Sequence, residues 1–327
     1  MQVSHISLFP FERRYYSVFF VAAEMVVKEH IELLEGLASG DRKALARCIT
    51  VVENELPGYQ EILQTIRPAS VPVIGITGPP GAGKSTLINA MLRVLTDRGK
   101  NIGVIAVDPT SPFNYGSLLG DRLRMAEHFN NERIFIRSLA TRGSLGGLSE
   151  KIIEIIDVMR STGFDLIIVE TVGVGQSEVE IAGLADTTVV VLVPESGDEV
   201  QALKSGIMEI ADIFLVNKAD REGAEALTNN LRKMLHHPKT GGWIIPVIPV
   251  VATQSEGMTE FLEQIEKHRL SSGYNEKKAF LLAEKAYQLI RKHRMHDMKR
   301  DQIRAEIEMA SQSADFNLYT FVSRYIR

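Results

Sequence analysis

A glycine-rich stretch directly after an apolar run is the feature that most restricts how this chain can fold. The run VPVIGIT, residues 71–77, has the length and β-branched content of a buried strand. A glycine-rich stretch and then an amphipathic helical pattern follow it. The pattern G-x-x-x-x-G-K-[ST] in this context predicts a phosphate-binding loop, because its glycines let backbone N–H groups turn inward. We expect the loop to comprise Gly78, Pro79, Pro80, Gly81, Ala82, Gly83, Lys84, Ser85 and Thr86.

Two side chains of this loop are candidates for the chemistry of a nucleotide. Lys84 is expected to reach the β- and γ-phosphates, and the Ser85 hydroxyl is expected to bind Mg²⁺. The helix that begins here adds the positive end of its dipole. The sequence therefore predicts a nucleotide-binding site.

Apolar runs alternate with amphipathic segments from residue 71 to about residue 270. Strands joined by helices need crossover connections, which predicts an α/β fold with a mainly parallel, doubly wound sheet. Residues 1–70 are expected to be a helical extension, 71–270 the nucleotide-binding domain and 271–327 a second helical extension. The expected strands are 71–77, 102–107, 133–138, 165–170, 187–193, 212–217 and 246–251.

The composition limits the partners of this chain. Its 327 residues carry a formal net charge of −4, which gives no electrostatic reason to expect nucleic acid or an anionic membrane. No apolar run approaches the ~20 residues that span a bilayer. Cys48 is the single cysteine, which excludes an internal disulfide and favours a reducing, cytoplasmic setting.

A second motif indicates which base the site binds. The apolar run IFLV is followed by Asn217, Lys218, Ala219 and Asp220, an N-K-x-D pattern at the end of a later strand. Asp220 can accept hydrogen bonds from guanine N1–H and the exocyclic amine, which adenine does not offer. We expect Asn217 to brace the loop and the Lys218 stem to cover the ring. Backbone amides near Ala252 and Thr253 are candidates for the guanine carbonyl.

Three carboxylates are candidates to complete the Mg²⁺ site. Asp108 and Glu170 each end an apolar strand, and Asp121 lies in GSLLGDRLRM. Asp121 is also a possible helix cap, and Asp108 before Pro109 is also explained by turn chemistry. Glu170 is harder to explain otherwise, because a charge at the end of a buried strand is costly without a partner. The segment ETVGVGQ is therefore interpreted as a nucleotide-sensing switch, and Gln176 within it is a candidate to orient water.

Several long motifs together resemble one family. The runs VDPTSPFNYGSLLGDRLRM, RSLATRGSLGGLS, VETVGVGQSEVEIAGLAD and PESGDEVQALKSGIMEIADIFLVNKAD are similar to the MeaB/ArgK family of P-loop GTPases. These proteins are chaperones of cobalamin-dependent acyl-CoA mutases such as methylmalonyl-CoA mutase. The resemblance implies a homodimeric enzyme that hydrolyses GTP to GDP slowly, is stimulated by the mutase, and gates adenosylcobalamin delivery.

The resemblance also assigns residues. It implies that Asp108, Asp121 and Glu170 surround the metal with Ser85, and it marks residues 194–206 as a further switch facing the partner. An ordinary strand-to-helix loop is the alternative for that segment. Arg142 is a candidate either for charge stabilisation or for partner binding. The candidates for the partner switch are Asp198, Glu199 and Lys204.

Two other classes of protein remain as alternatives. A metal-insertion GTPase would need a Cys/His cluster, which a single cysteine disfavours. A P-loop kinase would need an acceptor pocket and a base, for which no separate candidate is visible. The histidines show no ligand spacing, so we expect neither bound cobalamin nor a transition metal in this chain. The C-terminal helices are the expected dimer surface.

Overall fold

One parallel sheet organises the larger part of the molecule. The structure, a computed structural model, describes residues 31–108, 125–140, 148–171, 177–194, 207–235, 242–271, 276–313 and 315–325. Seven strands pair in parallel in the order β3-β2-β4-β1-β5-β6-β7. Their bounds are β1 Val73–Thr77, β2 Ile102–Asp108, β3 Ile134–Ala140, β4 Leu166–Glu170, β5 Thr187–Leu192, β6 Ile213–Asn217 and β7 Val247–Val250.

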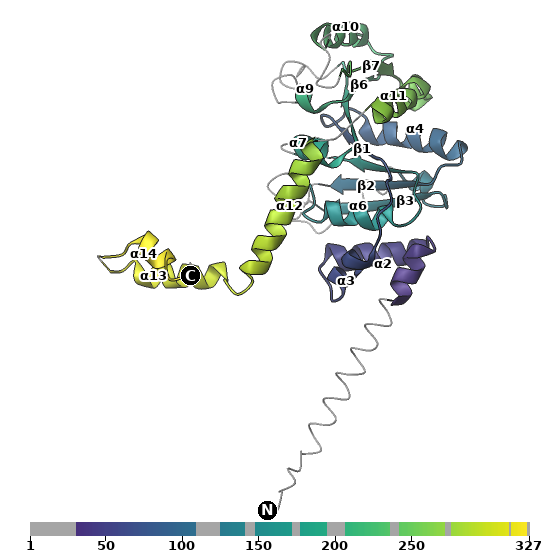
Figure 1. Cartoon of the computed structure of the whole chain (residues 1–327). Coiled ribbons are helices and arrows are strands. Elements are labelled where there is room, and N and C mark those ends of the chain that lie inside the picture. The colour runs from purple at the N-terminus through teal and green to yellow at the C-terminus, as the bar shows by residue number, and fades with distance from the viewer. Residues whose placement is uncertain are drawn as a thin grey trace, which may run out of the picture. The chain divides into compact units, whose positions relative to one another are not determined.

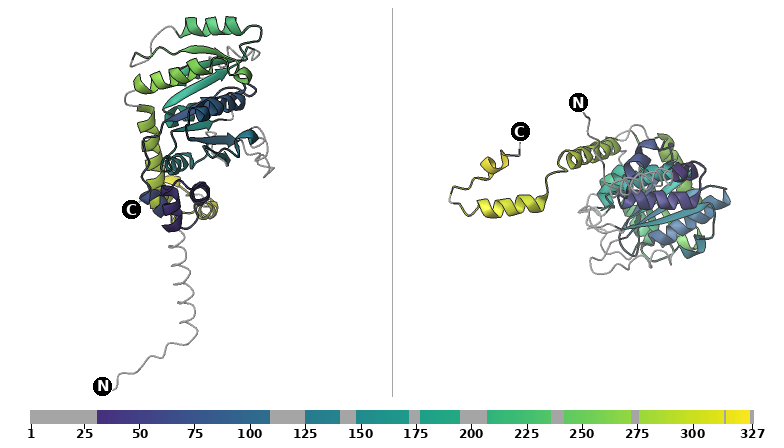
Figure 2. Two further views of the ribbon diagram at one scale, coloured as in Figure 1. Left: turned by 90° about the vertical axis from the view of Figure 1, so that its right-hand side faces the viewer. Right: turned by 90° about the horizontal axis from the view of Figure 1, so that it is seen from below.

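Helices cover both faces of this sheet, as a doubly wound fold requires (Figures 1 and 2). The helices α4 Lys84–Asp97 and α11 Met258–Ser271 pack on one face, where Ile74, Ile76 and Ile168 meet Leu87 and Phe261 in one apolar core. The other face is covered by α6 Ile152–Arg160, α7 Ser177–Leu184, α9 Ile207–Ile210 and α10 Ala224–Met234. The expected α/β fold is confirmed.

Three aspartates close the amino edge of the sheet in the same way. Asp165, Asp186 and Asp212 each directly precede a strand, and each carboxylate accepts a backbone N–H from the neighbouring strand at 2.8 Å. The backbone N–H of each aspartate in turn donates to the carbonyl of that same neighbouring residue, also at 2.8 Å. Each pair thus joins two strands where their ladder begins. The neighbouring residues are Asn101, Val73 and Thr188.

Helices near the N-terminus form an outer layer on α6. The helices α2 Arg42–Glu53 and α3 Tyr59–Thr65 pack against it. Asp41 caps α2, as its sequence predicts, by accepting from Lys43 N–H at 2.8 Å.

Cys48 is fully buried in this layer, and burial raises the pKa of its thiol to about 11. Cys48 is therefore an apolar core residue rather than a reactive one.

The chain divides into two compact units, Met1–Asn275 and Glu276–Arg327. The second contains α12 Glu276–Arg294, α13 Arg300–Ala310 and α14 Leu318–Val322. Asn317 caps α14 by accepting from Tyr319 and Thr320 N–H. Among the described residues of this unit, Phe321 is the one buried side chain. No helix in the described ranges is both long enough and apolar enough to cross a bilayer.

Candidate nucleotide-binding site

The loop between β1 and α4 has the backbone that close contact with a phosphate requires. Gly78 has φ +140°, and a Cβ there would lie 2.1 Å from the Val191 carbonyl oxygen. Gly83 has φ +82°, and a Cβ there would lie 2.5 Å from Nδ2 of Asn217. Both positions need glycine, for conformation and for space. Gly83 directly precedes α4, so the helix N-terminus opens onto the loop.

Lys84 is buried and lies across this loop. Its ammonium donates to the carbonyl oxygens of Gly78 at 2.8 Å and Pro79 at 3.1 Å. These acceptors are neutral, so the Lys84 ammonium gains additional Coulomb attraction when a negatively charged phosphate oxygen replaces them. Lys84 is thus held at the loop in a position from which it can transfer to an anionic ligand.

The structure brings Ser85 and Glu170 together. The Ser85 hydroxyl donates to Oε1 of Glu170 at 2.8 Å, across 85 residues of sequence. Glu170 ends β4, which pairs directly with β1 so that Ile76 lies opposite Glu170. Because the Ser85 hydroxyl uses its proton in this bond, the lone pairs of its oxygen can bind a cation. A hydroxyl and a carboxylate oxygen in contact are ligands that suit a hard cation such as Mg²⁺.

Asn217 joins the phosphate loop to the expected base loop. Its Nδ2 donates to the Ala82 carbonyl at 2.9 Å, and its Oδ1 accepts from Ala252 N–H at 3.2 Å. The side chain is buried, so both hydrogen bonds are shielded from water. A single amide therefore sets the distance between the two loops.

The base-binding candidates lie at the carboxyl ends of β6 and β7. Lys218 adopts a left-handed conformation with φ +56°, and Ala219 N–H donates to the Val250 carbonyl at 3.1 Å. This turn leaves Asp220 exposed beside the short helix η2, Ala252–Gln254. Ala252 is buried and Thr253 is exposed. The phosphate loop, Glu170 and Asp220 thus all follow strands at one edge of the sheet.

Some candidates cannot be placed. Asp108 ends β2, but its side chain is outside what the structure describes. The remaining metal, switch and partner candidates lie outside the described residues altogether. They are Asp121, Arg142, Gln176, Asp198, Glu199 and Lys204.

Three residues near the site carried no signal in the sequence motifs. Thr171 donates from its hydroxyl to the Thr77 hydroxyl at 2.8 Å, and both are buried. Glu180 in α7 accepts from Leu148 N–H at 3.3 Å, and burial raises the pKa of Glu180 above its ordinary value. Thr77 directly precedes the predicted phosphate loop and Thr171 lies within the predicted switch ETVGVGQ, but neither motif assigns a role to these hydroxyls.

A polar hollow of about 750 Å³ lies at the opposite edge of the sheet, away from these residues. It is lined by Asn101, Glu127, Asn130, Asn131, Glu132 and Arg133. Glu127 and His128 belong to the short helix η1, Ala126–His128.

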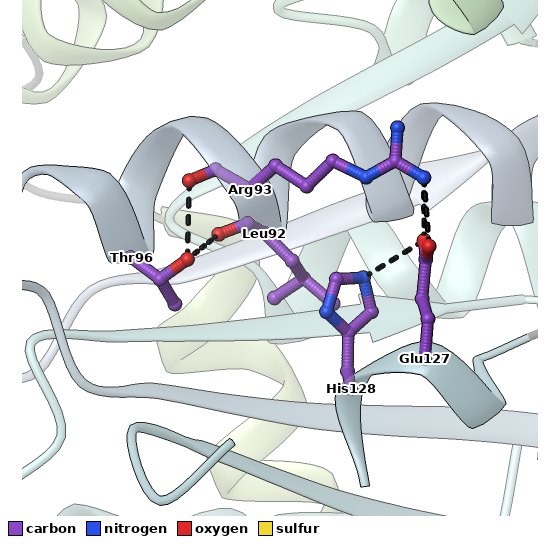
Figure 3. Close-up of polar contacts among 5 residues, drawn as sticks. All are labelled: Leu92, Arg93, Thr96, Glu127 and His128. Carbon is purple, nitrogen blue, oxygen red and sulfur yellow. Dashed lines mark hydrogen bonds and ion pairs between the residues drawn. The ribbon is translucent and has the colours of Figure 1, made fainter. Parts of the chain in front are cut away.

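Figure 3 shows how η1 is attached to α4. Arg93 Nη2 donates to both carboxylate oxygens of Glu127 at 2.8 Å. Burial lowers the pKa of His128, although the Glu127 carboxylate opposes this effect. The half-exposed ion pair of Arg93 and Glu127 indicates a structural contact here.

Known proteins share this sequence and this fold. The family model described as methylmalonyl-CoA mutase-associated GTPase MeaB matches residues 45–308. A protein of Pyrococcus abyssi named as a GTPase is 51% identical over 73% of this chain and 75% of its own length. The GTPase ArgK of Escherichia coli is 36% identical over 72% of this chain and 74% of its own length.

A solved structure extends the similarity to most of the chain. The structure described as LAO/AO transport system kinase aligns with a TM-score of 0.64, covering 90% of this chain and 97% of the other. At 24% identity this similarity shows the shared fold. The phosphate loop, the N-K-x-D turn and the family match agree: this chain is a GTPase and belongs to the MeaB family of methylmalonyl-CoA mutase-associated GTPases.

Proposed function

We propose that this GTPase is a chaperone of a cobalamin-dependent acyl-CoA mutase, such as methylmalonyl-CoA mutase. In this role it docks on the mutase, gates the delivery of adenosylcobalamin, and protects or reactivates the mutase. The observation that carries the proposal is the family match over residues 45–308, because the family is described as mutase-associated. A reducing, cytoplasmic setting is part of the proposal.

The residues of the site support a mechanism in which the protein mainly positions GTP and balances its charge. Lys84 exchanges its bonds to two loop carbonyls for bonds to phosphate oxygens. Ser85 and Glu170 are the pair that would hold Mg²⁺, which supplies neutralisation of phosphate charge when bound. Asp108 and Asp121 are proposed to complete that shell, and Gln176 is proposed to orient the attacking water.

Guanine selectivity is proposed to come from Asp220. Its carboxylate would accept from N1–H and the exocyclic amine of guanine. The η2 amides near Ala252 and Thr253 are proposed for the guanine carbonyl, with Ala252 N–H exchanging its bond to Asn217 for this one. Adenine would leave the carboxylate without donors, which disfavours binding of ATP relative to GTP by orders of magnitude. The bonds of Asn217 support this geometry because they place η2 next to the phosphate loop.

A homodimer formed through α12 is proposed as the assembled state. Leu282, Leu289 and Ile290 are about half exposed and repeat at the spacing of one helix face, i, i+7 and i+8. A helix of 19 residues with such a stripe is stabilised when another helix covers it. Sedimentation of a Leu289→Asp variant should show a monomer, and the neighbouring Gln288→Asp variant should keep the dimer.

The decisive experiment measures hydrolysis of GTP and ATP with and without a cobalamin-dependent acyl-CoA mutase. We expect selective GTP turnover that rises when the mutase is added, and no rise with a Lys84→Ala variant. GTP turnover that no such mutase changes would refute the proposed client while leaving the GTPase intact. Phosphate transfer to a small-molecule acceptor, or a preference for ATP, would instead indicate a kinase.

The proposed switch contacts through Arg142, Asp198, Glu199 and Lys204 are tested by alanine variants in the mutase-stimulated assay.

A further inference from the structure

Two buried hydroxyl groups lie at the ends of the strands that carry the phosphate loop and Glu170. Thr77 is the last residue of β1, immediately before Gly78, and Thr171 immediately follows Glu170. The Thr171 hydroxyl donates to the Thr77 hydroxyl at 2.8 Å, and Thr171 N–H donates to the Ile76 carbonyl at 3.0 Å. Both side chains are essentially inaccessible to water.

The strand pleat directs these hydroxyls away from the metal candidates. Side chains alternate between the two faces of a strand, so Glu170 and Thr171 point to opposite faces. Glu170 meets Ser85 on the face that α4 covers. Thr77 shares its face with Gly75, against whose backbone Ile181 of α7 packs. The hydroxyl pair therefore lies beneath the sheet, behind the groups that would bind the ligand.

We propose that Thr77 and Thr171 are positioning residues for GTP hydrolysis. Their hydrogen bond fixes the end of β4 against the end of β1, and so fixes Glu170 relative to Ser85 and the phosphate loop. Both strands end here, and the bond from Thr171 N–H to the Ile76 carbonyl is the last backbone bond between them in the described part of the chain. Misplacing a charged group by about 1 Å is enough to slow a reaction by up to 10²-fold.

A substitution by valine can distinguish the role of the threonine hydroxyl from the role of the side chain in packing. Valine has nearly the same shape and the same preference for strands, but it lacks the hydroxyl. Replacing both partners of a buried hydrogen bond by apolar groups of the same shape is nearly neutral for stability. A Thr77→Val/Thr171→Val double variant should therefore fold, while the strand ends lose the hydroxyl bond and keep the backbone bond from Thr171 N–H to the Ile76 carbonyl.

The test compares Thr171→Val, Thr77→Val, the double variant and Thr171→Ser in steady-state GTP hydrolysis at varied Mg²⁺. We expect Thr171→Val to lower kcat about 10-fold and to raise the Mg²⁺ concentration for half-maximal rate, with KM for GTP within about 2-fold. Thr171→Ser keeps the hydroxyl and should stay within about 3-fold of the parent kcat. The double variant should be no slower than Thr171→Val, since one shared bond is lost.

A matched control is Thr228→Val in α10, where a buried hydroxyl donates to the Ala224 carbonyl at 2.8 Å. It should leave kcat and the Mg²⁺ dependence unchanged. Parent-like kinetics of Thr171→Val, or equal losses in Thr171→Val and Thr171→Ser, would overturn the proposal. Because the pair acts through the role proposed for Glu170, a Glu170→Gln variant is measured alongside. If Glu170→Gln is fully active, the proposed metal site fails. If Glu170→Gln is slow and Thr171→Val is normal, only the positioning role fails.

Discussion

At the amino edge of the sheet, Asp165, Asp186 and Asp212 bind backbone N–H groups of neighbouring strands, whereas at the carboxyl edge Glu170 binds the hydroxyl of Ser85. In every case a carboxylate directly flanks a strand. The amino-edge partners are backbone N–H groups, to which Lys100 adds a bond at Asp165 and Arg160 adds one at Asp186. The carboxyl-edge partner is a side chain in the first turn of α4, whose oxygen is also proposed to bind Mg²⁺. The two edges thus differ in burial and in partner, since Glu170 is buried whereas Asp165 is exposed and Asp186 and Asp212 are half-buried. The difference teaches that a buried carboxylate paired with a hydroxyl, unlike one paired with backbone N–H groups, is the candidate for a functional role.

The largest expected effect comes from removing the charge of Glu170. A Glu170→Gln variant should lose about 100- to 1,000-fold in kcat, because an amide cannot supply the negative ligand proposed for Mg²⁺. Its melting temperature should stay within about 3 °C of the parent, since the amide can still accept from Ser85. Steady-state hydrolysis and thermal unfolding measure the two quantities. A variant with parent kcat and a lower melting temperature would place Glu170 with the amino-edge aspartates.

Asp220 gives the next largest effect, on nucleotide selectivity. An Asp220→Asn variant should bind GTP about 100-fold more weakly, because the amide NH₂ replaces an acceptor by a donor facing guanine N1–H. The same NH₂ can donate to the C2 carbonyl of xanthine, so affinity for xanthosine triphosphate should rise. Titration calorimetry with both nucleotides checks this reversal. Unchanged GTP affinity would exclude Asp220 from the base site.

Asp186 should show the opposite profile, a loss of stability with normal kinetics. Its carboxylate accepts from Val73 N–H at 2.8 Å and from Arg160 at 3.3 Å. An Asp186→Ala variant leaves these donors without that acceptor and should lower the free energy of unfolding by about 2 kcal/mol. Urea denaturation measures this value. A fall in kcat or in GTP affinity beyond about 2-fold would show that the two edges are energetically coupled.

The smallest effect concerns the pH dependence of stability through Asp165. The backbone N–H of Asn101, assisted by the Lys100 ammonium, holds the pKa of Asp165 below its ordinary value. A carboxyl group with a lowered folded-state pKa stabilises the folded protein above its unfolded-state pKa, and that contribution is lost as pH falls. An Asp165→Asn variant should therefore differ most from the parent near neutral pH and converge with it below about pH 4. Urea denaturation between pH 3 and pH 7 would show parallel curves if Asp165 did not contribute.

The strands of the sheet and the position of the phosphate loop could be predicted from the sequence. Each of the seven expected strands lies within two residues of an observed strand, because strands buried on both faces leave continuous apolar runs. The strand–loop–helix context of Lys84 and Ser85 also fixed their location at the carboxyl edge. Such a motif can be recognised in the sequence because the strand, the loop and the helix that form it are consecutive.

Contacts between residues that are far apart in sequence could not be predicted from such local patterns. The sequences FDLIIVE, ADTTVVVL and ADIFLVN each place an aspartate before a strand, yet the bonded N–H groups lie 64, 113 and 24 residues away. Thr77 and Thr171 are 94 residues apart, and either could have faced solvent, a ligand or the core. Which strands are neighbours decides these contacts, and single strand patterns do not encode that order.

Through its two bonds, Asn217 joins the phosphate loop to η2, where guanine is proposed to bind, so we expect the two parts of a nucleotide to affect each other's binding. A ligand that orders the phosphate loop also orders η2, so it lowers the entropic cost for a second ligand at the base loop. Guanosine and inorganic pyrophosphate, added as separate molecules, should consequently bind with positive cooperativity. In GTP, binding of the guanine part would then raise the affinity of the site for the phosphate part, and the reverse, through the Asn217 side chain.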